Sequence, residues 1–446
     1  MKRRMYLATF GCQMNEYDSE RMVRLMAEQD YTQTTDLEQA DFILLNTCSI
    51  REKAELKVYS YLGRLRKLKE KRPDLIVGLS GCVAQQEGEN LLKNVPHLDL
   101  VVGTHGVHRL PRLVEEVRRN GKQVCHIEFD YHLPTAPKIA SAAGPVKAFI
   151  TIMQGCDNFC AYCVVPYLRG REASRPPADI LAEAEGLLAQ DVREITLLGQ
   201  NVNSYGHGLN PSTNFTELIE RISDLEGLYR LRFTTSHPKD LSPELIRALA
   251  ETKTLCEHIH LPAQSGSTRT LKSMGRKYTR ENYLDRVDAL RDACPEVAIS
   301  TDIIVGFPGE TDADFDQTMD LLERVRFDGI YSFKYSDRPM TKASRSEDKI
   351  PDEIKSARLS TLQALQKEII LAKNKALVGT HAEVLVEGPS KRQTGQMTGR
   401  TRTNRIVNFS GTEELTGRLE QVVVLEAYAN SLRGELYRPG NSPDIT

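Results

Sequence analysis

Short apolar runs alternate with longer amphipathic segments along most of the chain, and this alternation limits the possible folds more than any other feature. In the first part of the chain the apolar runs fall at residues 5–10, 42–46, 75–80 and 98–103. Strands that alternate with helices build parallel sheets whose faces are covered by those helices. We therefore expect residues 1–125 to form an α/β domain around a doubly wound parallel sheet.

A second alternating series begins after residues 126–145, whose Pro, Ala and Ser residues without periodicity indicate an interdomain linker. Six further strand-like runs begin at residues 147, 194, 228, 257, 297 and 329. Six βα units favour a whole or partial α/β barrel over residues 146–377, and a doubly wound sheet is the alternative. A long helical pattern over residues 352–377 closes this domain.

The last part of the chain changes character after Gly379. Short runs rich in β-branched residues replace the alternation of strands and helices. This pattern predicts a small all-β module over residues 378–441. The chain is thus expected to contain three domains of different architecture, which suits its length of 446 residues.

Composition and charge exclude several classes of protein. The net charge is -2, so no basic surface for nucleic acid covers the whole protein, and any RNA contact must rest on a local patch. No apolar run approaches the ~18 residues of a membrane span, and the first apolar run ends at Gly11, too early for a secretory signal. We expect a cytoplasmic protein with no membrane contact, whose nine cysteines are reduced and available for metal chemistry.

Three cysteines share one loop after the first strand of the second series, and we call Cys156, Cys160 and Cys163 the loop triad. Zinc sites usually have four ligands in pairs, and this loop offers no fourth cysteine or nearby histidine. Three thiolates suit an iron–sulfur cubane better, because they bind three irons and leave the fourth open to a non-protein ligand. The loop triad therefore favours an iron–sulfur cluster over zinc.

Three other cysteines are far apart in sequence, and we call Cys12, Cys48 and Cys82 the dispersed triad. Each closely follows a predicted strand of the first domain, and the carboxyl ends of parallel strands meet at one edge of the sheet. The dispersed triad can therefore form a second metal centre. A lone buried cysteine is usually a small apolar residue, and we assign such structural roles to Cys125, Cys256 and Cys294.

The spacing of the loop triad, with Tyr162 before its last cysteine, is similar to the radical S-adenosylmethionine (SAM) signature. In that superfamily the open iron binds the amino and carboxylate groups of SAM. Together with the dispersed triad and the terminal β module, residues 3–440 resemble the methylthiotransferase family. The segments NTCSIREKAELKV and CVVPYLRGREASRP resemble its MiaB-type, tRNA-modifying branch. Leu168, Met340 and Lys342 depart from the usual residues of the family.

This resemblance implies a partial (β/α)6 radical-SAM core, a C-terminal TRAM barrel and a specific reaction. A methylthio group would replace the hydrogen on C2 of N6-isopentenyladenosine at position 37, beside the tRNA anticodon. That C–H bond is neither acidic nor electrophilically activated, so radical abstraction is a sensible route.

The resemblance also implies two 4Fe-4S clusters and SAM as cofactors. A cluster on the loop triad would reduce SAM to methionine and a deoxyadenosyl radical. A cluster on the dispersed triad would carry or deliver sulfur, and a second SAM molecule would methylate that sulfur. The expected partners are tRNA carrying an isopentenylated adenosine and an electron donor such as flavodoxin, and the expected oligomeric state is a monomer.

Polar and glycine-bearing residues at strand ends of the second domain are the expected SAM contacts, because ligands bind at that edge. These residues are Tyr162, Gly199, Gln200, Asn201, Ser236, Gln264 and Ser265. The alternative is that Gly and its neighbours only shape turns there. We expect His237 to be a hydrogen-bonding loop residue and Gly306–Glu310 to resemble a family segment near the nucleoside.

A basic stretch near the C-terminus is the expected RNA contact. Residues 391–405 contain five basic residues and no acidic one, and the predicted contacts are Lys391, Arg392, Arg400, Arg402 and Arg405. The alternative is a solvated charged hairpin. A second basic segment, residues 51–72, has nine Lys or Arg against three Glu, and such runs are usually solvated helix faces. Phe159 and Tyr167 are candidates for stacking on bases, whereas Phe149 is expected in the core.

Two other functions stay open at this point. The first is methylthiolation of a ribosomal protein or of another modified tRNA adenosine. The second is a non-catalytic RNA-binding protein that holds structural zinc.

Overall fold

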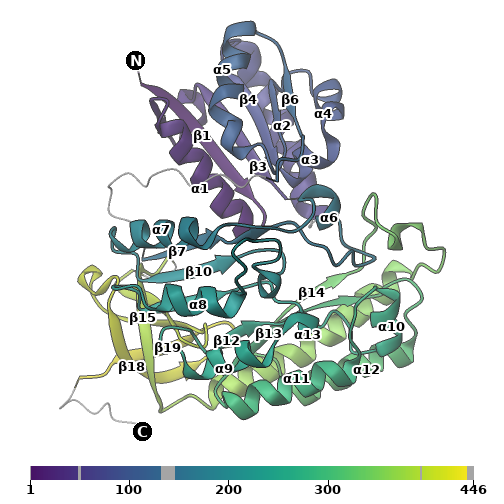
Figure 1. The fold of residues 1–446 in the computed structure, drawn as a ribbon, viewed down its shortest axis with the longest axis vertical. Helices are drawn as coiled ribbons and strands as arrows, with labels where there is room; N and C mark the ends of the chain where they lie inside the picture. Colours follow the sequence, from purple (N-terminus) through teal and green to yellow (C-terminus); the bar gives the residue numbers. More distant parts are fainter. Residues whose placement is uncertain (1, 49–51, 132–145, 392–393, 439–446) are drawn as a thin grey trace.

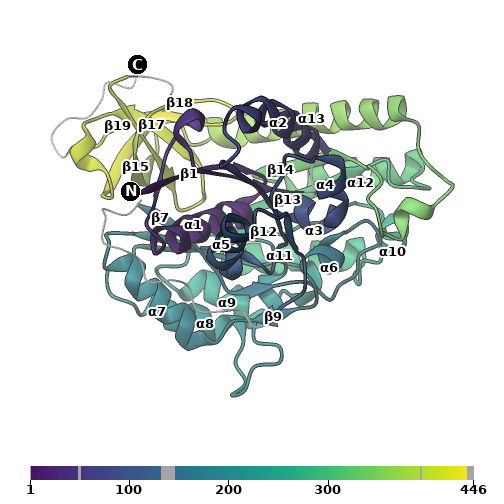
Figure 2. The same cartoon turned by 90° about the horizontal axis from the view of Figure 1, so that it is seen from above.

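The computed structural model describes residues 2–48, 52–131, 146–391 and 394–438, and these residues fold into three domains. An N-terminal α/β domain lies over an open α/β core, and a small β-barrel packs at one end of that core (Figures 1 and 2). The three expected architectures are confirmed. Arg392 and residues 132–145 of the expected linker lie outside the described residues.

The N-terminal domain contains a parallel sheet in the order β2-β1-β3-β4-β5-β6. Apolar side chains of its central strands point alternately to two cores, one under helices α1 and α5 and one under α2, α3 and α4. Because both faces are covered, every residue of β3 and β4 is buried. The strands are β1 (Arg3–Phe10), β2 (Tyr31–Gln33), β3 (Phe42–Thr47), β4 (Ile76–Gly81), β5 (Leu100–Val102) and β6 (Val124–His126). The helices are α1 (Gln13–Ala27), α2 (Glu52–Lys71), α3 (Cys82–Glu87), α4 (Glu89–Asn94) and α5 (Leu110–Asn120).

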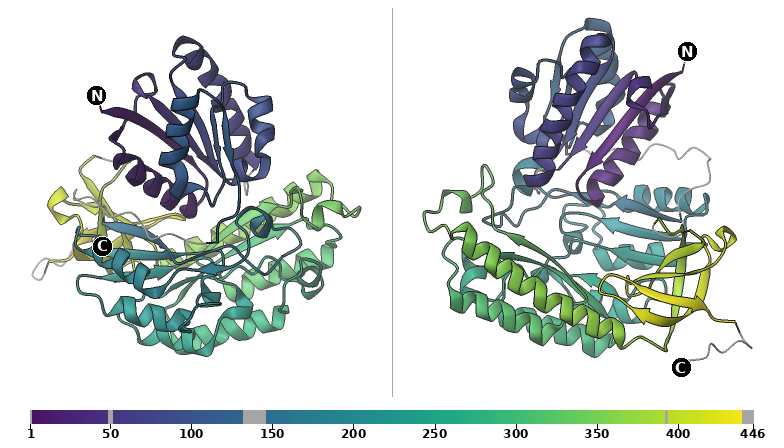
Figure 3. Two further views of the ribbon diagram at one scale, coloured as in Figure 1. Left: turned by 45° about the horizontal axis from the view of Figure 1, so that its top comes forward. Right: turned by 180° about the vertical axis from the view of Figure 1, so that it is seen from behind.

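The core contains the six expected strands as two parallel sheets, in the orders β11-β10-β7 and β12-β13-β14. A bridge between Leu231 and Leu255 joins the sheets into one open barrel, which decides against a doubly wound sheet. The helices form the outer layer of an arc, and the N-terminal domain faces its inner side (Figure 3). The strands are β7 (Lys147–Thr151), β10 (Glu194–Leu198), β11 (Arg230–Phe233), β12 (His258–His260), β13 (Ala298–Val305) and β14 (Gly329–Lys334), with a short hairpin-like pair β8 (Met153–Gln154) and β9 (Ala173–Ser174). The helices are α6 (Val165–Leu168), α7 (Pro177–Leu188), α8 (Phe215–Ser223), α9 (Pro243–Glu251), α10 (Thr268–Ser273), α11 (Arg280–Ala293), α12 (Asp312–Val325) and α13 (Asp352–Lys375).

The C-terminal domain is a closed barrel in the order β15-β16-β17-β19-β18. Its interior is filled by alternate apolar residues such as Val384, Val407 and Phe409. Its strands are β15 (His381–Pro389), β16 (Gln396–Thr401), β17 (Ile406–Ser410), β18 (Leu419–Ala427) and β19 (Leu432–Leu436). Helix α13 leads directly into this barrel and packs along β14 of the core (Figure 3).

The turn between β16 and β17 closes the amino-terminal end of the core. Arg230 of β11 is fully buried and donates hydrogen bonds to the Arg400 and Glu383 carbonyl oxygens. Arg232 donates to the carbonyl oxygens of Thr401 and Arg402, at 2.8 Å each. The small barrel is thus held against the core by buried arginines rather than by a flexible tether.

Helix α1 joins the N-terminal domain to the core through polar contacts. The Tyr17 hydroxyl donates to Glu183 of α7 at 3.2 Å, and the same carboxylate pairs with Arg175 at 2.7 Å. Nearby, Asp18 of α1 pairs with Arg169 of the core at 3.0 Å. These side chains are almost completely buried, so they set the position of one domain against the other. Among the described residues, no helix has the length and apolar character needed to cross a membrane.

Candidate active site

The dispersed triad meets at one edge of the N-terminal sheet. Strands β1, β3 and β4 are neighbours, and their register aligns Phe10 with Thr47 and Thr47 with Gly81. The residues that follow these strands therefore leave the sheet at the same level, which places the three cysteines together. Cys48 is hydrogen-bonded to both Cys12 and Cys82. The convergence predicted from the strand-end rule is thus present in the structure.

Two glycines permit this close approach. Gly11 precedes Cys12, and a Cβ atom at Gly11 would lie 2.6 Å from the Cβ atom of Cys48. Gly81 precedes Cys82 with φ of 91°, and a Cβ atom there would lie 2.3 Å from the Thr47 carbonyl oxygen. Any side chain at either position would push the strand ends apart, so these glycines keep the dispersed triad compact.

Electrostatics favour thiolates at two cysteines of the dispersed triad, Cys12 and Cys82. A hydrogen bond from Cys48 and the charge of Arg169 outweigh burial and lower the pKa of Cys12 to about 6. The same two groups lower the pKa of Cys82 to about 7, while the pKa of Cys48 is raised because it holds the shared proton. Arg169 comes from the core, so the core supplies the positive charge that thiolate ligands need.

The loop triad follows strand β8 and is fixed by three polar contacts. Gln200 accepts a hydrogen bond from the Gly155 backbone N–H at 2.6 Å. The Asn158 amide lies 3.4 Å from the Cys156 sulfur, and the Arg276 guanidinium lies 3.5 Å from the Cys160 sulfur. Both donors suit sulfur atoms that carry negative charge, and hydrogen bonds to sulfur tune cluster potentials.

In the loop triad, burial raises the pKa values of two thiols. It raises the pKa of Cys156 to about 11 and that of Cys163 to about 12. These thiols keep their protons at neutral pH unless positive charge is added, which a cluster of iron ions would supply. Among the described residues, no three Cys, His, Asp or Glu side chains are arranged to hold a single metal ion. A cubane places its three cysteine ligands on three different irons, so the donor set fits that group.

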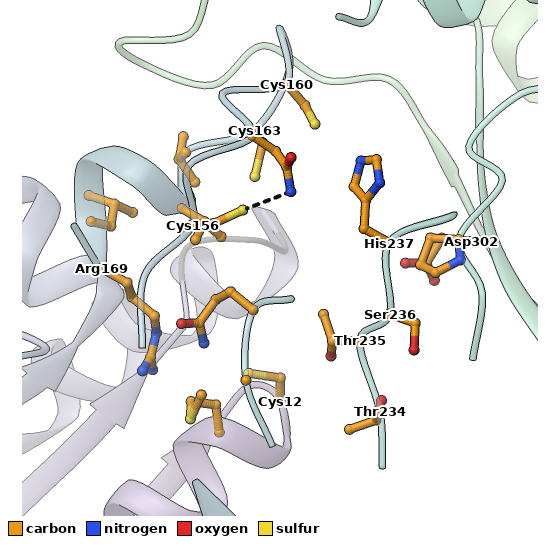
Figure 4. A pocket seen from close by; sticks show the side chains of 18 of the residues that line it. Cys12, Cys156, Cys160, Cys163, Arg169, Thr234, Thr235, Ser236, His237 and Asp302 are labelled. Atoms are coloured by element: carbon orange, nitrogen blue, oxygen red, sulfur yellow. Dashed lines mark hydrogen bonds between the residues drawn. The ribbon is translucent and has the colours of Figure 1, made fainter. Parts of the chain in front are cut away.

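Five of the six triad cysteines, all except Cys48, line a single cavity of about 350 Å³, part of which is drawn in Figure 4. Cys12 and Cys82 approach it from the N-terminal domain, and the whole loop triad approaches it from the core. His237, Ser236 and Thr235 lie across the cavity from these cysteines in Figure 4. The structure therefore brings two groups of metal ligands, from two domains, to one space between them.

Five of the seven predicted SAM contacts line this cavity, namely Tyr162, Gly199, Gln200, Ser236 and Gln264. The structure does not place the other two there. The Asn201 amide donates to Asp240 at 2.7 Å, and the Ser265 hydroxyl contacts Thr318 beneath the loop. Both side chains point away from the cavity because neighbouring residues along a loop face different sides.

The cavity wall contains features that suit a polar ligand. The Ser236 hydroxyl is buried without a hydrogen-bond partner, and an unpaired buried hydroxyl is costly. Thr235 and Gln264 have φ of 68° and 69°, a conformation that costs energy for residues with a side chain. An orphaned hydroxyl and strained strand ends around one cavity are consistent with contacts to a bound molecule such as SAM.

His237 acts as the loop residue that the sequence predicted. Its Nδ1 accepts the Lys239 backbone N–H at 3.2 Å. Burial and the Arg276 charge lower the pKa of His237 to about 2, so the imidazole is neutral. Its position suits hydrogen bonding within the cavity.

Three charged residues of the cavity were missed by sequence reasoning: Arg169, Arg276 and Asp302. Arg169 follows the loop triad closely, and its position in the family-like segment after Cys163 was a usable signal. Arg276 and Asp302 are single charged residues in a loop and a strand, and no spacing distinguishes them. Their importance becomes visible only when the barrel brings them to the cysteines.

The predicted RNA contacts have different surroundings. Arg402 forms an ion pair with Glu257 at 2.7 Å, and Arg405 pairs with Asp328 at 2.6 Å. Arg400 pairs with Glu387 at 3.0 Å, whereas the Lys391 residue is exposed. Arg402 and Arg405 thus contact the core, and their side chains are directed into the domain interface instead of away from it.

The basic helix α2 and the candidate stacking residues also include both exposed and internally paired side chains. Basic residues of α2 include Lys69, which pairs with Asp99 at 2.8 Å, so part of this charge is used within the domain. Phe159 and Tyr167 are exposed and make an edge-to-face contact with each other. Phe149 packs with Met14 and Leu198 at the domain interface, in agreement with its expected core role.

Comparison with known proteins identifies the three domains. Residues 4–103 match the uncharacterized protein family UPF0004, residues 150–322 match the radical SAM superfamily, and residues 375–437 match the TRAM domain. The tRNA-2-methylthio-N(6)-dimethylallyladenosine synthase of Syntrophobacter fumaroxidans is 53% identical over 441 residues, which cover 98% of this chain and 97% of the relative. The chain belongs to this synthase family.

Other members of the synthase family match over similar lengths. The enzyme of Geobacter metallireducens is 53% identical over 434 residues, covering 97% of this chain and 98% of the relative. Among solved structures, the radical SAM methyltransferase TsrM from Kitasatospora setae, determined with cobalamin and a [4Fe-4S] cluster, has a TM-score of 0.57 at 15% identity and covers 77% of this chain and 74% of TsrM. That likeness concerns the fold alone.

Proposed function

We propose that this protein is a radical-SAM methylthiotransferase that modifies C2 of N6-isopentenyladenosine at position 37 of tRNA. The observation that carries the proposal is the single cavity lined by cysteines of both triads. A transfer of sulfur to an unactivated carbon needs a radical source and a sulfur source at the same carbon, and two adjacent cluster sites meet that need. Membership of the synthase family supplies the substrate.

The dispersed triad and the loop triad would each hold one 4Fe-4S cluster. When bound, the clusters and SAM would supply the radical chemistry, the sulfur and the methyl group. The chain itself contributes position and charge. Arg169 balances the thiolates of the dispersed triad, and Arg276 and Asn158 donate to sulfurs of the loop triad.

The cavity residues would bind and orient SAM. Ser236 presents an unpaired hydroxyl, and Gln264 lines the cavity with its backbone hydrogen-bonded to Asp302 and Ile304. Tyr162 packs edge-to-face on Phe307 of the Gly306–Glu310 loop, so the aromatic residue of the loop triad is linked to the end of β13. Buried aromatic residues around the loop triad also keep bulk water from the reacting groups.

The TRAM barrel would hold the tRNA, with Lys391 and Arg400 as the described candidates for phosphate contacts. The ion pairs of Arg402 and Arg405 would fix the barrel against the core, so that RNA bound there is aligned with the cavity. We further propose that the enzyme is a cytoplasmic monomer that takes electrons from a small donor such as flavodoxin.

Nucleoside mass spectrometry of tRNA tests this function. A strain that lacks the gene should accumulate N6-isopentenyladenosine and lose its 2-methylthio derivative, and the wild-type gene should restore it. A variant with Cys156→Ala should not restore it. If the methylthio nucleoside persists undiminished in the deletion strain, the substrate assignment is wrong, and ribosomal protein or another modified adenosine becomes the candidate.

A further inference from the structure

Strands β12, β13 and β14 present a second wall beside the cysteine cavity. Register aligns His260 with Ser300, and Asp302 with Tyr331. Because side chains alternate between the two faces of a strand, Asp302, Tyr331 and Phe333 lie on the same face of the sheet. The opposite face is occupied by helices, since Ile330 packs in the main core and Ser332 accepts a hydrogen bond from Gln363 of α13.

The aromatic side chains on this wall are unusually exposed. Tyr331 is 57% exposed and Phe333 is 38% exposed, although both lie on the inner face of the core sheet. The inner face of a strand is normally filled by packed side chains. The two rings therefore border open space, and they lie on the edge strand of the described sheet.

A carboxylate joins this wall to the cavity. Asp302 lines the cysteine cavity and is 30% exposed. Its Oδ2 atom lies 3.4 Å from Nε2 of His260, and Nδ1 of His260 contacts the Ser300 hydroxyl at 3.0 Å. The His260 ring also makes an edge-to-face contact with Tyr331. Asp302 is thus a hydrogen-bond acceptor positioned by His260, and it lies between the cysteine cavity and the two exposed rings.

The wall also lies close to the TRAM barrel. Asp328 immediately precedes β14, and it pairs with Arg405 of that barrel. One end of the edge strand therefore contacts the RNA-binding domain, and the middle of the strand reaches Asp302 at the cavity.

We propose that this wall recognises the modified base, with Asp302 accepting a hydrogen bond from the exocyclic N6–H and with Tyr331 and Phe333 packing on the apolar N6 substituent. This inference rests on the proposed function and adds its specificity determinants. A secondary amine offers one donor, which suits a single carboxylate acceptor. The five-carbon substituent is apolar, which suits two exposed rings. The N–H donor and the apolar substituent are both on N6, so their partners must be adjacent. Asp302 and Tyr331 meet this requirement because they are paired in the β13–β14 register.

Binding of anticodon stem-loops to the cluster-loaded enzyme tests the apolar part. With SAM present and no reductant, wild-type enzyme should bind a stem-loop carrying N6-isopentenyladenosine roughly tenfold or more tightly than one carrying adenosine. The double variant Tyr331→Ala, Phe333→Ala should reduce this preference to less than about threefold. Tyr331→Phe should keep the preference because it keeps the ring.

The matched control is Tyr229→Ala. Tyr229 is 40% exposed and lies just before β11, at the amino-terminal end of a core strand. This variant should leave the preference unchanged. The iron content and the affinity for SAM should be the same in all variants. Equal preference in wild type and the double variant, or no preference in wild type, would overturn the inference.

A base without the N6–H tests the carboxylate. Wild-type enzyme should bind a stem-loop with N6-methyl-N6-isopentenyladenosine roughly tenfold more weakly than the N6-isopentenyl stem-loop. Asp302→Ala should bind the two alike. If Asp302→Ala instead weakens SAM binding and still discriminates, the carboxylate belongs to SAM and its assigned role is wrong. Methylthiolation of the N6-isopentenyl stem-loop by wild-type enzyme, measured by mass spectrometry, tests the proposed function separately.

Discussion

Replacing Arg169 with methionine tests how the N-terminal domain is held against the core. The Arg169 and Asp18 side chains are 5% and 12% exposed, and they pair at 3.0 Å across the interface. Methionine keeps much of the length of the side chain but leaves the Asp18 carboxylate buried without a counter-charge. Removing one partner of a buried pair costs about 3–5 kcal/mol. We expect about 3 kcal/mol, because Asp18 keeps some contact with water.

Urea unfolding of the metal-free protein measures this cost. For an m-value of about 2–3 kcal/mol/M, a loss of about 3 kcal/mol lowers the midpoint by roughly 1 M. The double variant Arg169→Met, Asp18→Asn should recover at least half of the loss, because no buried charge is then unpaired. The control is Arg171→Met, since Arg171 and its partner Asp157 are 62% and 34% exposed and such a pair contributes less than about 1 kcal/mol.

An Arg169→Met variant that unfolds at the wild-type midpoint would show that this ion pair does not hold the interface. A double variant as unstable as the single variant would show that the cost does not come from an unpaired charge.

Three further predictions concern stability. Met340 has φ of 69°, a conformation that favours glycine, so Met340→Gly should relieve about 1 kcal/mol and raise the melting temperature of the core by about 2–4 °C; an unchanged or lower value would contradict this. Arg230→Met leaves Glu383 and a buried carbonyl unpaired, so the C-terminal barrel should detach more often and limited proteolysis after α13 should accelerate roughly thirtyfold or more. Equal cleavage rates would exclude a role in docking. The neutral, buried His237 has its pKa lowered to about 2, so the folded state binds fewer protons than the unfolded state and stability falls as pH drops below about 6.5, by at most about 1.4 kcal/mol per unit. His237→Gln should show a shallower decline between pH 7 and pH 5.5 in urea unfolding, and parallel curves would disprove the assignment.

Much of the fold follows from local patterns that a sequence displays. The main strands of the first two domains were predicted because each is a short apolar run bounded by polar residues. Strands β2 and β6 were missed because most of their residues are exposed or half-buried, whereas β5 is equally short but fully buried and lies in an apolar run. The meeting of Cys12 and Cys82 was predictable from a general rule about parallel strands and did not require any knowledge of side-chain contacts.

The parts of the site that escaped prediction depend on contacts between distant residues. Arg402 was predicted to contact RNA because its neighbours are basic, and its ion pair with Glu257, more than a hundred residues away, gave no local signal. Asn201 and Ser265 were placed at the correct strand ends, yet the directions of their side chains depend on loop conformation. Asp302 was missed because one acid within an apolar strand resembles an ordinary polar substitution.

Iron analysis of anaerobically reconstituted protein shows directly whether the two triads hold two separate clusters. We expect about eight irons per wild-type chain, and about four in each of two triple-alanine variants, one for the dispersed triad and one for the loop triad. Electron paramagnetic resonance of each reduced variant should show the signal of a single cluster. A dispersed-triad variant that retains the full iron content of the wild type would show that this triad holds no cluster.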